Sequence, residues 1–313
     1  MIAFGPVPSR RLGHSLGINH IPPKHCPYSC VYCQVGRTTA LTLKRRVFYP
    51  LAQILREVEE KIASSRQLGL PIDYLTLVPD GEPTLDLQLG AIIQSLKQFQ
   101  IPVAVISNAA LIDRPEVREE LSAADWVSLK VDTVDDLEWK KINRPQGHLV
   151  LSALLNGMMD FKRMFSGTLV TETMLVSGIN ESQDSLQRLA AYLLKLQPSR
   201  SFLSIPTRPP AETWVKSPEA GQLGSILEFF AERVPFMDLL FEAEAADFHS
   251  TGSFVDDLLA ITAVHPIRER ALRKMVEQAG EDWSTVERLV AEARMIAIPY
   301  REEVFFLRKH AEK

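Results

Sequence analysis

The fold of this chain is decided by one short stretch, Cys26-Pro27-Tyr28-Ser29-Cys30-Val31-Tyr32-Cys33. It contains all three cysteines of the 313-residue sequence, spaced four and then three positions apart. A ferredoxin-type run normally supplies four cysteines, so that every iron of the cluster has a protein ligand. Three thiolates can instead hold one face of a cubane iron–sulfur cluster and leave one iron open. We therefore expect a cluster whose open iron binds a small molecule.

Three other interpretations of these cysteines were considered. A structural zinc site takes four ligands, and His25 could supply the fourth, but it adjoins Cys26 and the chain would have to fold back on itself. A redox-active C-x-x-C pair leaves Cys26 without a role. Three inert, buried thiols with this spacing would be a coincidence. The open cluster uses all three cysteines and needs no fourth protein ligand.

The C-x-x-x-C-x-x-C spacing, with Tyr32 directly before the last cysteine, resembles the radical S-adenosylmethionine (radical SAM) superfamily. The resemblance implies that Cys26, Cys30 and Cys33 hold a [4Fe-4S] cluster. It also implies that SAM chelates the open iron through its amino and carboxylate groups, with Tyr32 beside the adenine. One electron from the reduced cluster then cleaves SAM to methionine and a 5′-deoxyadenosyl radical, which abstracts hydrogen from a substrate.

Composition is that of a soluble globular protein, with 46% hydrophobic and 24% charged residues. No apolar run of about 18 residues is present to span a membrane, and the first residues lack a signal-peptide pattern. Three closely spaced cysteines favour a reducing compartment over a disulfide framework. We therefore expect a cytoplasmic protein with one large domain and a small appendage.

Charge is distributed unevenly along the chain. Residues 1–49 contain seven basic and no acidic residues, so a net charge of −4 for the whole chain leaves −11 for the remainder. This segment either compensates the anionic cluster and the SAM carboxylate or attracts an anionic substrate, such as a phosphate, a carboxylate or a nucleic acid. Within it, Arg10 and Arg11 either brace an expected lead-in loop at residues 4–13 or hold substrate.

Apolar periodicity predicts six strands that alternate with helices. The strands are expected at residues 15–19, 73–78, 103–106, 126–131, 168–176 and 202–205, and the helices at 50–69, 86–99, 115–121, 148–165 and 182–196. Such alternation predicts an α/β fold with a parallel sheet and helical crossovers. The superfamily resemblance implies that the sheet curls into a partial (β/α)6 TIM-like barrel.

The second expected strand is followed by Gly81-Glu82-Pro83, which resembles a Gly-Glu-Pro motif of the superfamily. Active sites of such barrels lie on the loops that follow the strands. The resemblance therefore implies that Gly81, Glu82 and Pro83 contact the SAM amino group. A simple turn is the alternative.

Polar residues also end the later strands. The resemblance implies that Asn108, Lys130 and Asp132 contact the SAM ribose or carboxylate, and Glu172 is a further candidate. A buried ion pair between Lys130 and Asp132 is the alternative. No catalytic acid, base or radical-donating residue can be singled out, and no cysteine outside the motif is present to form a thiyl radical.

The chain after the barrel is expected to form a separate unit. A proline-rich loop at residues 206–218 either covers substrate, with Arg208 and Trp214 as contacts, or is a connector. A helix at residues 219–232 and a polar boundary at 242–253 follow. Three helices are expected next: one at residues 254–264, a second that ends at Gly280, and a third that begins at a Ser284–Glu287 capping box. Together with a hairpin at 296–307, they predict a winged-helix-like domain. We thus expect domains at residues 1–250 and 251–313.

The predicted function is that of a single-cluster radical SAM enzyme with an electron donor such as flavodoxin or ferredoxin. The opening at residues 4–24 resembles an uncharacterised wyosine-synthase-like branch, which implies a tRNA substrate, but wyosine synthases carry a second cluster and this chain has no cysteines for one. The substrate classes left open are a nucleoside or tRNA, a small metabolite, and a peptide or protein. Alternatives are a peptide maturase, a glycyl-radical-enzyme activase and a DNA-binding regulator. The regulator is disfavoured because residues 254–313 contain 10 basic and 11 acidic residues, whereas a DNA-binding domain is usually basic.

Overall fold

The computed structural model describes residues 1–240 and 248–309. Its main sheet consists of β1 (Ala3–Ser9), β2 (Gly13–Ile18), β5 (Tyr74–Leu77), β6 (Val103–Ser107), β7 (Trp126–Lys130), β8 (Thr168–Met174), β9 (Arg200–Ser204) and β10 (Met237–Leu239). The strands are ordered β1-β2-β5-β6-β7-β8-β9-β10. All neighbours from β2 onward are parallel, and β1 is antiparallel to β2. The six predicted strands are therefore confirmed.

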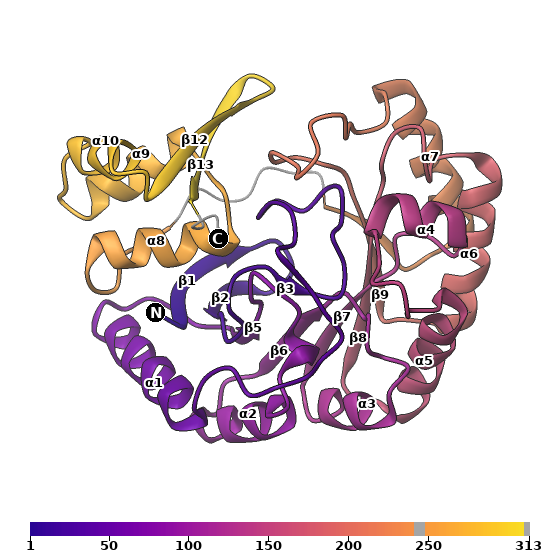
Figure 1. The fold of residues 1–313 in the computed structure, drawn as a ribbon, viewed down its shortest axis with the longest axis horizontal. Helices are drawn as coiled ribbons and strands as arrows, with labels where there is room; N and C mark the ends of the chain where they lie inside the picture. The colour runs from indigo at the N-terminus through magenta and orange to yellow at the C-terminus, as the bar shows by residue number, and fades with distance from the viewer. Residues whose placement is uncertain (241–247, 310–313) are drawn as a thin grey trace.

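Helices cover the outer face of this curved sheet, as Figure 1 shows. They are α1 (Leu51–Gln67), α2 (Leu89–Leu96), α3 (Pro115–Leu121), α4 (Asp136–Asn143), α5 (Leu151–Met164), α6 (Gln183–Leu196) and α7 (Ala220–Arg233), with 3₁₀ turns η1 (Pro83–Leu85) and η2 (Lys97–Phe99). Each long helix buries one face; in α5, Leu154, Met158 and Phe161 are buried at helical spacing. The result is the mostly parallel, partly closed sheet typical of radical SAM barrels.

Two local predictions fail for identifiable reasons. The lead-in loop expected at residues 4–13 is instead the hairpin of β1 and β2. Pro6 and Pro8 lack a backbone N–H, and β1 tolerates them because it is an edge strand with a register shift between Phe4 and Val7. Helix α4 was not predicted. It is short, and its start depends on the Asp135 carboxylate, which accepts hydrogen bonds from the backbone N–H groups of Leu137 and Glu138.

The C-terminal elements confirm the expected helices and hairpin. They are α8 (Phe254–Val264), β11 (Ile267–Arg268), α9 (Glu269–Gln278), α10 (Ser284–Ala291), β12 (Met295–Tyr300) and β13 (Glu303–Arg308). The strands form a small antiparallel sheet in the order β11-β13-β12. The capping box is wrong: Ser284 is the first residue of α10, and its N–H donates to the Asp282 carboxylate at 2.9 Å.

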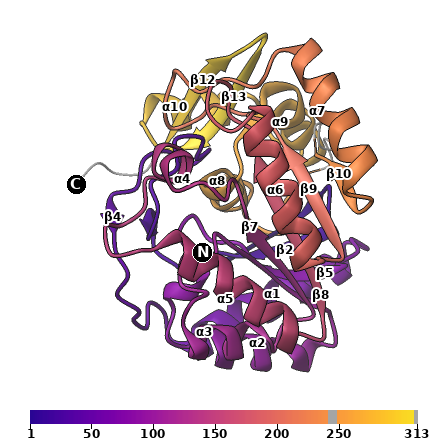
Figure 2. The same cartoon turned by 90° about the vertical axis from the view of Figure 1, so that its right-hand side faces the viewer.

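These elements pack on the β1 edge of the main sheet (Figures 1 and 2). Phe4 and Val7 of β1 share one hydrophobic cluster with α8 and α9, separate from the larger core between the sheet and its helices. A buried ion pair joins Lys61 of α1 to Asp257 of α8. The boundary at residues 250/251 stays a prediction, and residues 242–247 of the expected boundary segment lie outside the described residues. Among the described helices, none is long and apolar enough to cross a bilayer.

Candidate active site

A cavity of about 340 Å³ opens where the parallel strands end. Most of the predicted site residues line it together: Cys26, Cys30, Cys33, Tyr32, Gly81, Glu82, Asn108, Lys130 and Glu172. The cysteine loop begins in a short parallel pair, β3 (His25–Cys26) with β4 (Ala40–Leu41). Its backbone is then fixed to the end of α4, because the Val31 N–H donates to the Ile142 carbonyl at 2.8 Å.

Each cysteine sulfur has a side-chain N–H donor beside it. Asn108 Nδ2 lies 3.1 Å from Cys26 Sγ, Asn143 Nδ2 lies 3.4 Å from Cys30 Sγ, and Lys24 Nζ lies 3.4 Å from Cys33 Sγ. Donors in this position suit thiolate sulfur, which accepts hydrogen bonds.

Burial raises the pKa of the Cys30 thiol to about 12 and also raises the pKa of the Cys26 thiol. The Cys26 and Cys30 thiols therefore need a bound cation to lose their protons, and a coordinated metal has that effect. The donor set and the burial together fit a thiolate-ligated iron–sulfur cluster.

His25 is not placed as a fourth ligand. Its Nε2 lies 2.7 Å from Arg46 Nη2, its Nδ1 faces the Pro22 carbonyl at 3.2 Å, and the residue does not line the cavity. Within residues 1–240 and 248–309, no three His, Cys, Asp or Glu side chains could hold one metal ion.

The Gly81-Glu82-Pro83 segment follows β5 and contacts the end of β6. A Cβ atom at Gly81 would lie 2.4 Å from the His25 carbonyl oxygen, so only glycine lets the cysteine loop approach this closely. The Glu82 side chain is 1% exposed; it accepts hydrogen bonds from Ser107 Oγ at 2.7 Å and from the Asn108 N–H at 2.8 Å. Glu82 thereby positions Asn108. Pro83 begins η1 outside the cavity lining. Contact of this segment with SAM stays a prediction.

Asp132 lies behind the cavity wall. Its carboxylate accepts hydrogen bonds from Tyr32 Oη, from Asn143 Nδ2 at 2.7 Å and from the Met174 N–H at 2.9 Å. The residue does not line the cavity, so a direct contact with SAM remains a prediction that this geometry does not favour. Asp132 orients Tyr32 instead.

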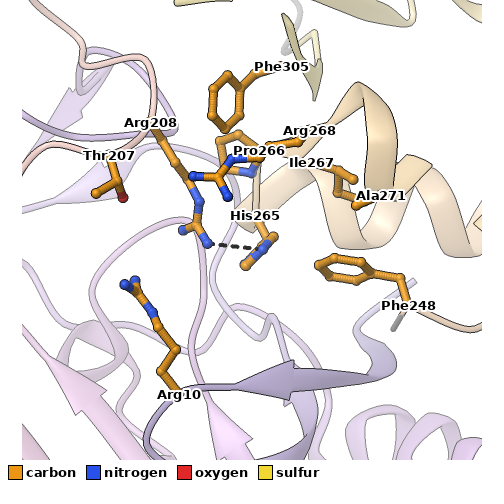
Figure 3. Close-up of a pocket in the computed structure, with 10 residues that line it drawn as sticks. All are labelled: Arg10, Thr207, Arg208, Phe248, His265, Pro266, Ile267, Arg268, Ala271 and Phe305. Carbon is orange, nitrogen blue, oxygen red and sulfur yellow. Dashed lines mark hydrogen bonds between the residues drawn. The ribbon is translucent and has the colours of Figure 1, made fainter. Parts of the chain in front are cut away.

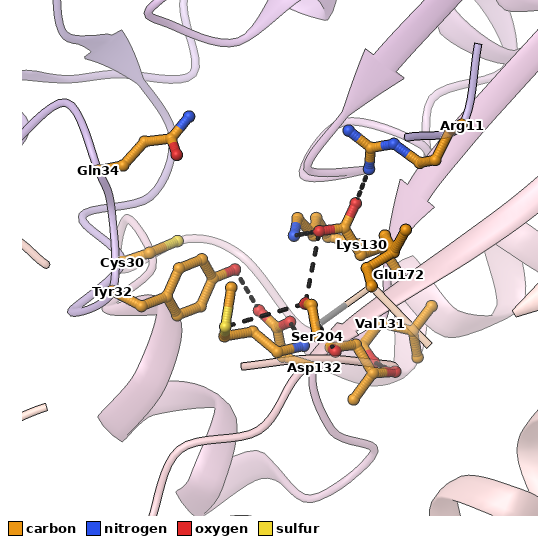
Figure 4. A network of polar contacts seen from close by, with 12 residues as sticks. Arg11, Cys30, Tyr32, Gln34, Lys130, Val131, Asp132, Glu172 and Ser204 are labelled. Atoms are coloured by element: carbon orange, nitrogen blue, oxygen red, sulfur yellow. Dashed lines mark hydrogen bonds and ion pairs between the residues drawn. The ribbon is translucent and has the colours of Figure 1, made fainter. Parts of the chain in front are cut away.

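Glu172 is held between Arg11 and Lys130 (Figure 4). Lys130 Nζ lies 2.7 Å from Glu172 Oε1 and 5.5 Å from the centre of the Tyr32 ring. Burial alone would raise the Glu172 pKa, but the charges of Arg11 and Lys130 outweigh it and lower the pKa to about 2. The ionised trio carries one net positive charge. The ion pair considered for Lys130 and Asp132 is not formed.

Part of the basic N-terminal segment is used for internal pairing. Arg11 pairs with Glu172, Arg37 with Glu212 at 2.9 Å, and Arg45 with Glu120. These three arginines therefore pair with carboxylates of the protein itself, which neither expectation for the basic segment included. Arg10 and Arg11 both line the cavity.

Several site residues had no signal in the sequence. Asn143 ends the unpredicted α4, and His265 reaches the cavity from the end of α8. In the proline-rich loop, Arg208 lines the cavity, while Trp214 does not and is 47% exposed.

A family model described as the radical SAM superfamily matches residues 21–190. The UPF0026 protein MJ1312 of Methanocaldococcus jannaschii is 42% identical over 309 residues, which cover 98% of this chain and 96% of that one. A UPF0026 protein of Helicobacter pylori strain J99 is 31% identical over 269 residues, 85% of each chain. The chain belongs to the UPF0026 family within the radical SAM superfamily.

Solved structures agree in fold. A radical SAM methyltransferase from Sphaerobacter thermophilus has a TM-score of 0.58 at 14% identity, and the match covers 72% of this chain and 66% of that one. A structure of TYW1 with a lysine-pyruvate adduct has a TM-score of 0.54 at 14% identity, covering 70% and 73%. The protein is thus a radical SAM enzyme, and its superfamily implies a [4Fe-4S] cluster and SAM as cofactors.

Proposed function

We propose that this enzyme cleaves SAM reductively at a single cluster held by Cys26, Cys30 and Cys33 and that it acts on an anionic substrate. The observation that carries the proposal is the convergence of these three cysteines, each with its own N–H donor, on a cavity at the strand ends. Cys26, Cys30 and Cys33 would hold the cluster, which would supply the one electron needed to cleave SAM to methionine and a 5′-deoxyadenosyl radical able to abstract hydrogen from substrate.

The chain's own residues have distinct roles in this proposal. Asn108, Asn143 and Lys24 stabilise negative charge on the sulfurs, which favours the reduced state of a cluster. Tyr32, oriented by Asp132, offers a ring to the adenine, and the Lys130 ammonium next to it supplies positive charge for the SAM carboxylate. Positive charge at the cavity also supports an anionic substrate.

The C-terminal unit takes part in the site in this proposal. Val264 and His265 line the cavity, and Gln34, next to Cys33, donates to the Val264 carbonyl at 3.0 Å. The element order and the β11-β13-β12 sheet support a winged-helix-like domain that closes one side of the cavity. Its neutral charge balance does not favour DNA binding.

The test is anaerobic reconstitution with iron and sulfide, reduction with dithionite and addition of SAM. We expect 5′-deoxyadenosine, measured by chromatography, in the wild type and none in Cys30→Ala. Replacing dithionite by flavodoxin or ferredoxin with its reductase tests the electron donor. Zinc in place of iron, or a stable cluster without SAM cleavage under any condition, would contradict the proposal.

A further inference from the structure

A surface beside the cysteine loop exposes both apolar and basic side chains. This β4 face is formed by five exposed residues, Leu41, Lys44, Arg46, Val47 and Leu87. The three apolar side chains among them are 47%, 53% and 53% exposed. The Arg46 N–H and carbonyl are both hydrogen-bonded to the segment that ends at Leu87, at 3.0 and 3.1 Å, so Val47 and Leu87 lie on neighbouring segments. Large apolar side chains gathered in this way are typical of an interaction surface.

The β4 face adjoins the cluster ligands through the backbone. Cys26 and Leu41 are Cα partners in the parallel pair of β3 and β4, and the Thr42 N–H donates to the Cys26 carbonyl at 3.2 Å. Arg46 reaches the same pair of strands, because its Nη2 lies 2.7 Å from His25 Nε2. An electron that arrives at this face therefore has one strand to cross before it reaches a cluster ligand.

Two other sides of the cysteine loop are in contact with neighbouring segments. On one side, Gln34 Nε2 donates to the Val264 carbonyl at 3.0 Å, and Arg208 joins Gln34 to the His265 ring, as Figure 3 shows for the contact with His265. On another side, the backbone of the proline-rich loop donates to the Val31 carbonyl at 3.0 Å. A partner protein would have to displace these segments to approach from there, whereas the side chains of the β4 face are already exposed.

The charge of the β4 face is positive. Residues 37–49 contain four basic and no acidic residues, and two of the four are paired with carboxylates of other segments. The other two, Lys44 and Arg46, are exposed and have no carboxylate partner within residues 1–240 and 248–309. The Arg46 guanidinium lies 4.8 Å from the centre of the Phe48 ring, which holds the group in place without cancelling its charge. A partner for this face would therefore carry negative charge.

We propose that the β4 face is the docking surface of an acidic, FMN-carrying electron-transfer protein of the flavodoxin kind. Exposed apolar side chains beside two cations match a partner whose flavin edge is apolar and whose surrounding surface is acidic. The partner's FMN hydroquinone would be oxidised by one electron, and the cluster would be reduced by that electron. The inference rests on the proposed function, which requires a one-electron donor.

The test is calorimetric titration of the reconstituted enzyme with a purified flavodoxin, at low salt and at about 0.5 M salt. Lys44→Glu and Arg46→Glu should each weaken binding by roughly threefold to tenfold at low salt, and the loss should disappear at high salt, because exposed charges are then screened. Leu87→Ser should weaken binding at both salt concentrations, because an apolar contact is not screened.

Lys195→Glu is the matched control for the charge reversals. Lys195 is an exposed lysine in the last turn of α6, outside the β4 face, so its replacement should leave the affinity for flavodoxin unchanged. Thermal melting and iron content establish that all variants are folded and loaded.

Equal affinity for flavodoxin in the wild type, Lys44→Glu and Arg46→Glu would overturn the inference. A ferredoxin whose binding depends on these two residues, when that of flavodoxin does not, would also overturn it, because the partner would then be an iron–sulfur protein. SAM cleavage is measured separately on the wild type with dithionite, which needs no docking surface. Flavodoxin binding that depends on Lys44 without any dithionite-driven formation of 5′-deoxyadenosine would reject the proposed function and leave the docking surface in place.

Discussion

The cysteine end of the cavity, formed by Lys24, the three cysteines and Asn108, differs in construction from its arginine end, formed by Arg10, Arg11, Arg208 and His265. At the cysteine end, the three proposed cluster ligands lie within eight residues of sequence, and single N–H donors face single sulfurs. At the arginine end, the side chains come from the turn after β1, the loop after β9 and the end of α8.

The two ends of the cavity therefore depend on different parts of the structure. The cysteine end needs one loop to keep its shape, so changes to that loop should affect cluster binding first. The arginine end needs the β1 hairpin and the C-terminal unit to stay docked, so changes there should affect global stability or substrate affinity. Four substitutions test this contrast.

The largest effect is expected at Glu172, which neutralises charge at the arginine end. Glu172→Gln leaves Arg11 and Lys130 partly buried without their anion, and removing one partner of a buried pair costs about 3–5 kcal/mol. Urea denaturation should show this loss. In the control, Asp238→Asn, an exposed pair with Arg200 is broken, which should cost about 1 kcal/mol or less. Similar losses in both variants would argue against the buried network.

Asp80 lines the cavity, and burial raises its pKa from 3.8 to about 7. Because the pKa of Asp80 is higher in the folded than in the unfolded state, its contribution to the free energy of unfolding is largest below pH 4. That contribution is lost as the pH rises toward 7. The stability of Asp80→Asn relative to the wild type should therefore increase by about 2–3 kcal/mol between pH 5 and pH 8. Denaturation at both values measures it, with Asp184→Asn as a control for loss of an exposed charge. A constant difference would contradict the shifted pKa.

Gly81 sets the distance between β5 and the cysteine loop. A Cβ 2.4 Å from the His25 carbonyl forces the backbone to move, so Gly81→Ala should cost about 1–3 kcal/mol and reduce the iron content after reconstitution. Gly147→Ala is the matched control, since its Cβ would meet no atom within 4 Å. Full iron loading of Gly81→Ala would show that the loop can shift without losing the cluster.

The smallest effect is expected from a single donor at the cysteine end. Lys24→Gln removes a charged donor 3.4 Å from Cys33 Sγ. One hydrogen bond is worth about 1 kcal/mol, which for one electron corresponds to a reduction potential lower by about 40 mV. Spectroscopic redox titration measures the potential. Lys44→Gln controls for loss of a positive charge from an exposed position in the same basic segment. An unchanged potential in Lys24→Gln would show that this donor does not act on the cluster.

The sequence by itself predicted the three cysteines as cluster ligands, which stays a prediction, and located the six parallel strands. Both are local patterns: ligand spacing within one loop, and apolar runs that only a buried strand explains. The same reasoning failed for β1, because its prolines are acceptable only at a sheet edge, and whether a strand is an edge is a property of the assembled sheet.

Only the tertiary structure decided which polar groups meet in the cavity. Arg11 and Glu172 are 161 positions apart, and Arg208 and Gln34 are 174 apart. No local pattern encodes such pairs, because they form only after the sheet has curled and the C-terminal unit has packed on β1. The same holds for Asp132, whose motif position suggested a ligand contact but whose carboxylate is turned toward Tyr32 and Asn143. Residue type and strand position predicted that polar side chains gather at the strand ends. Long-range packing determined which of them pair and in which direction each one points.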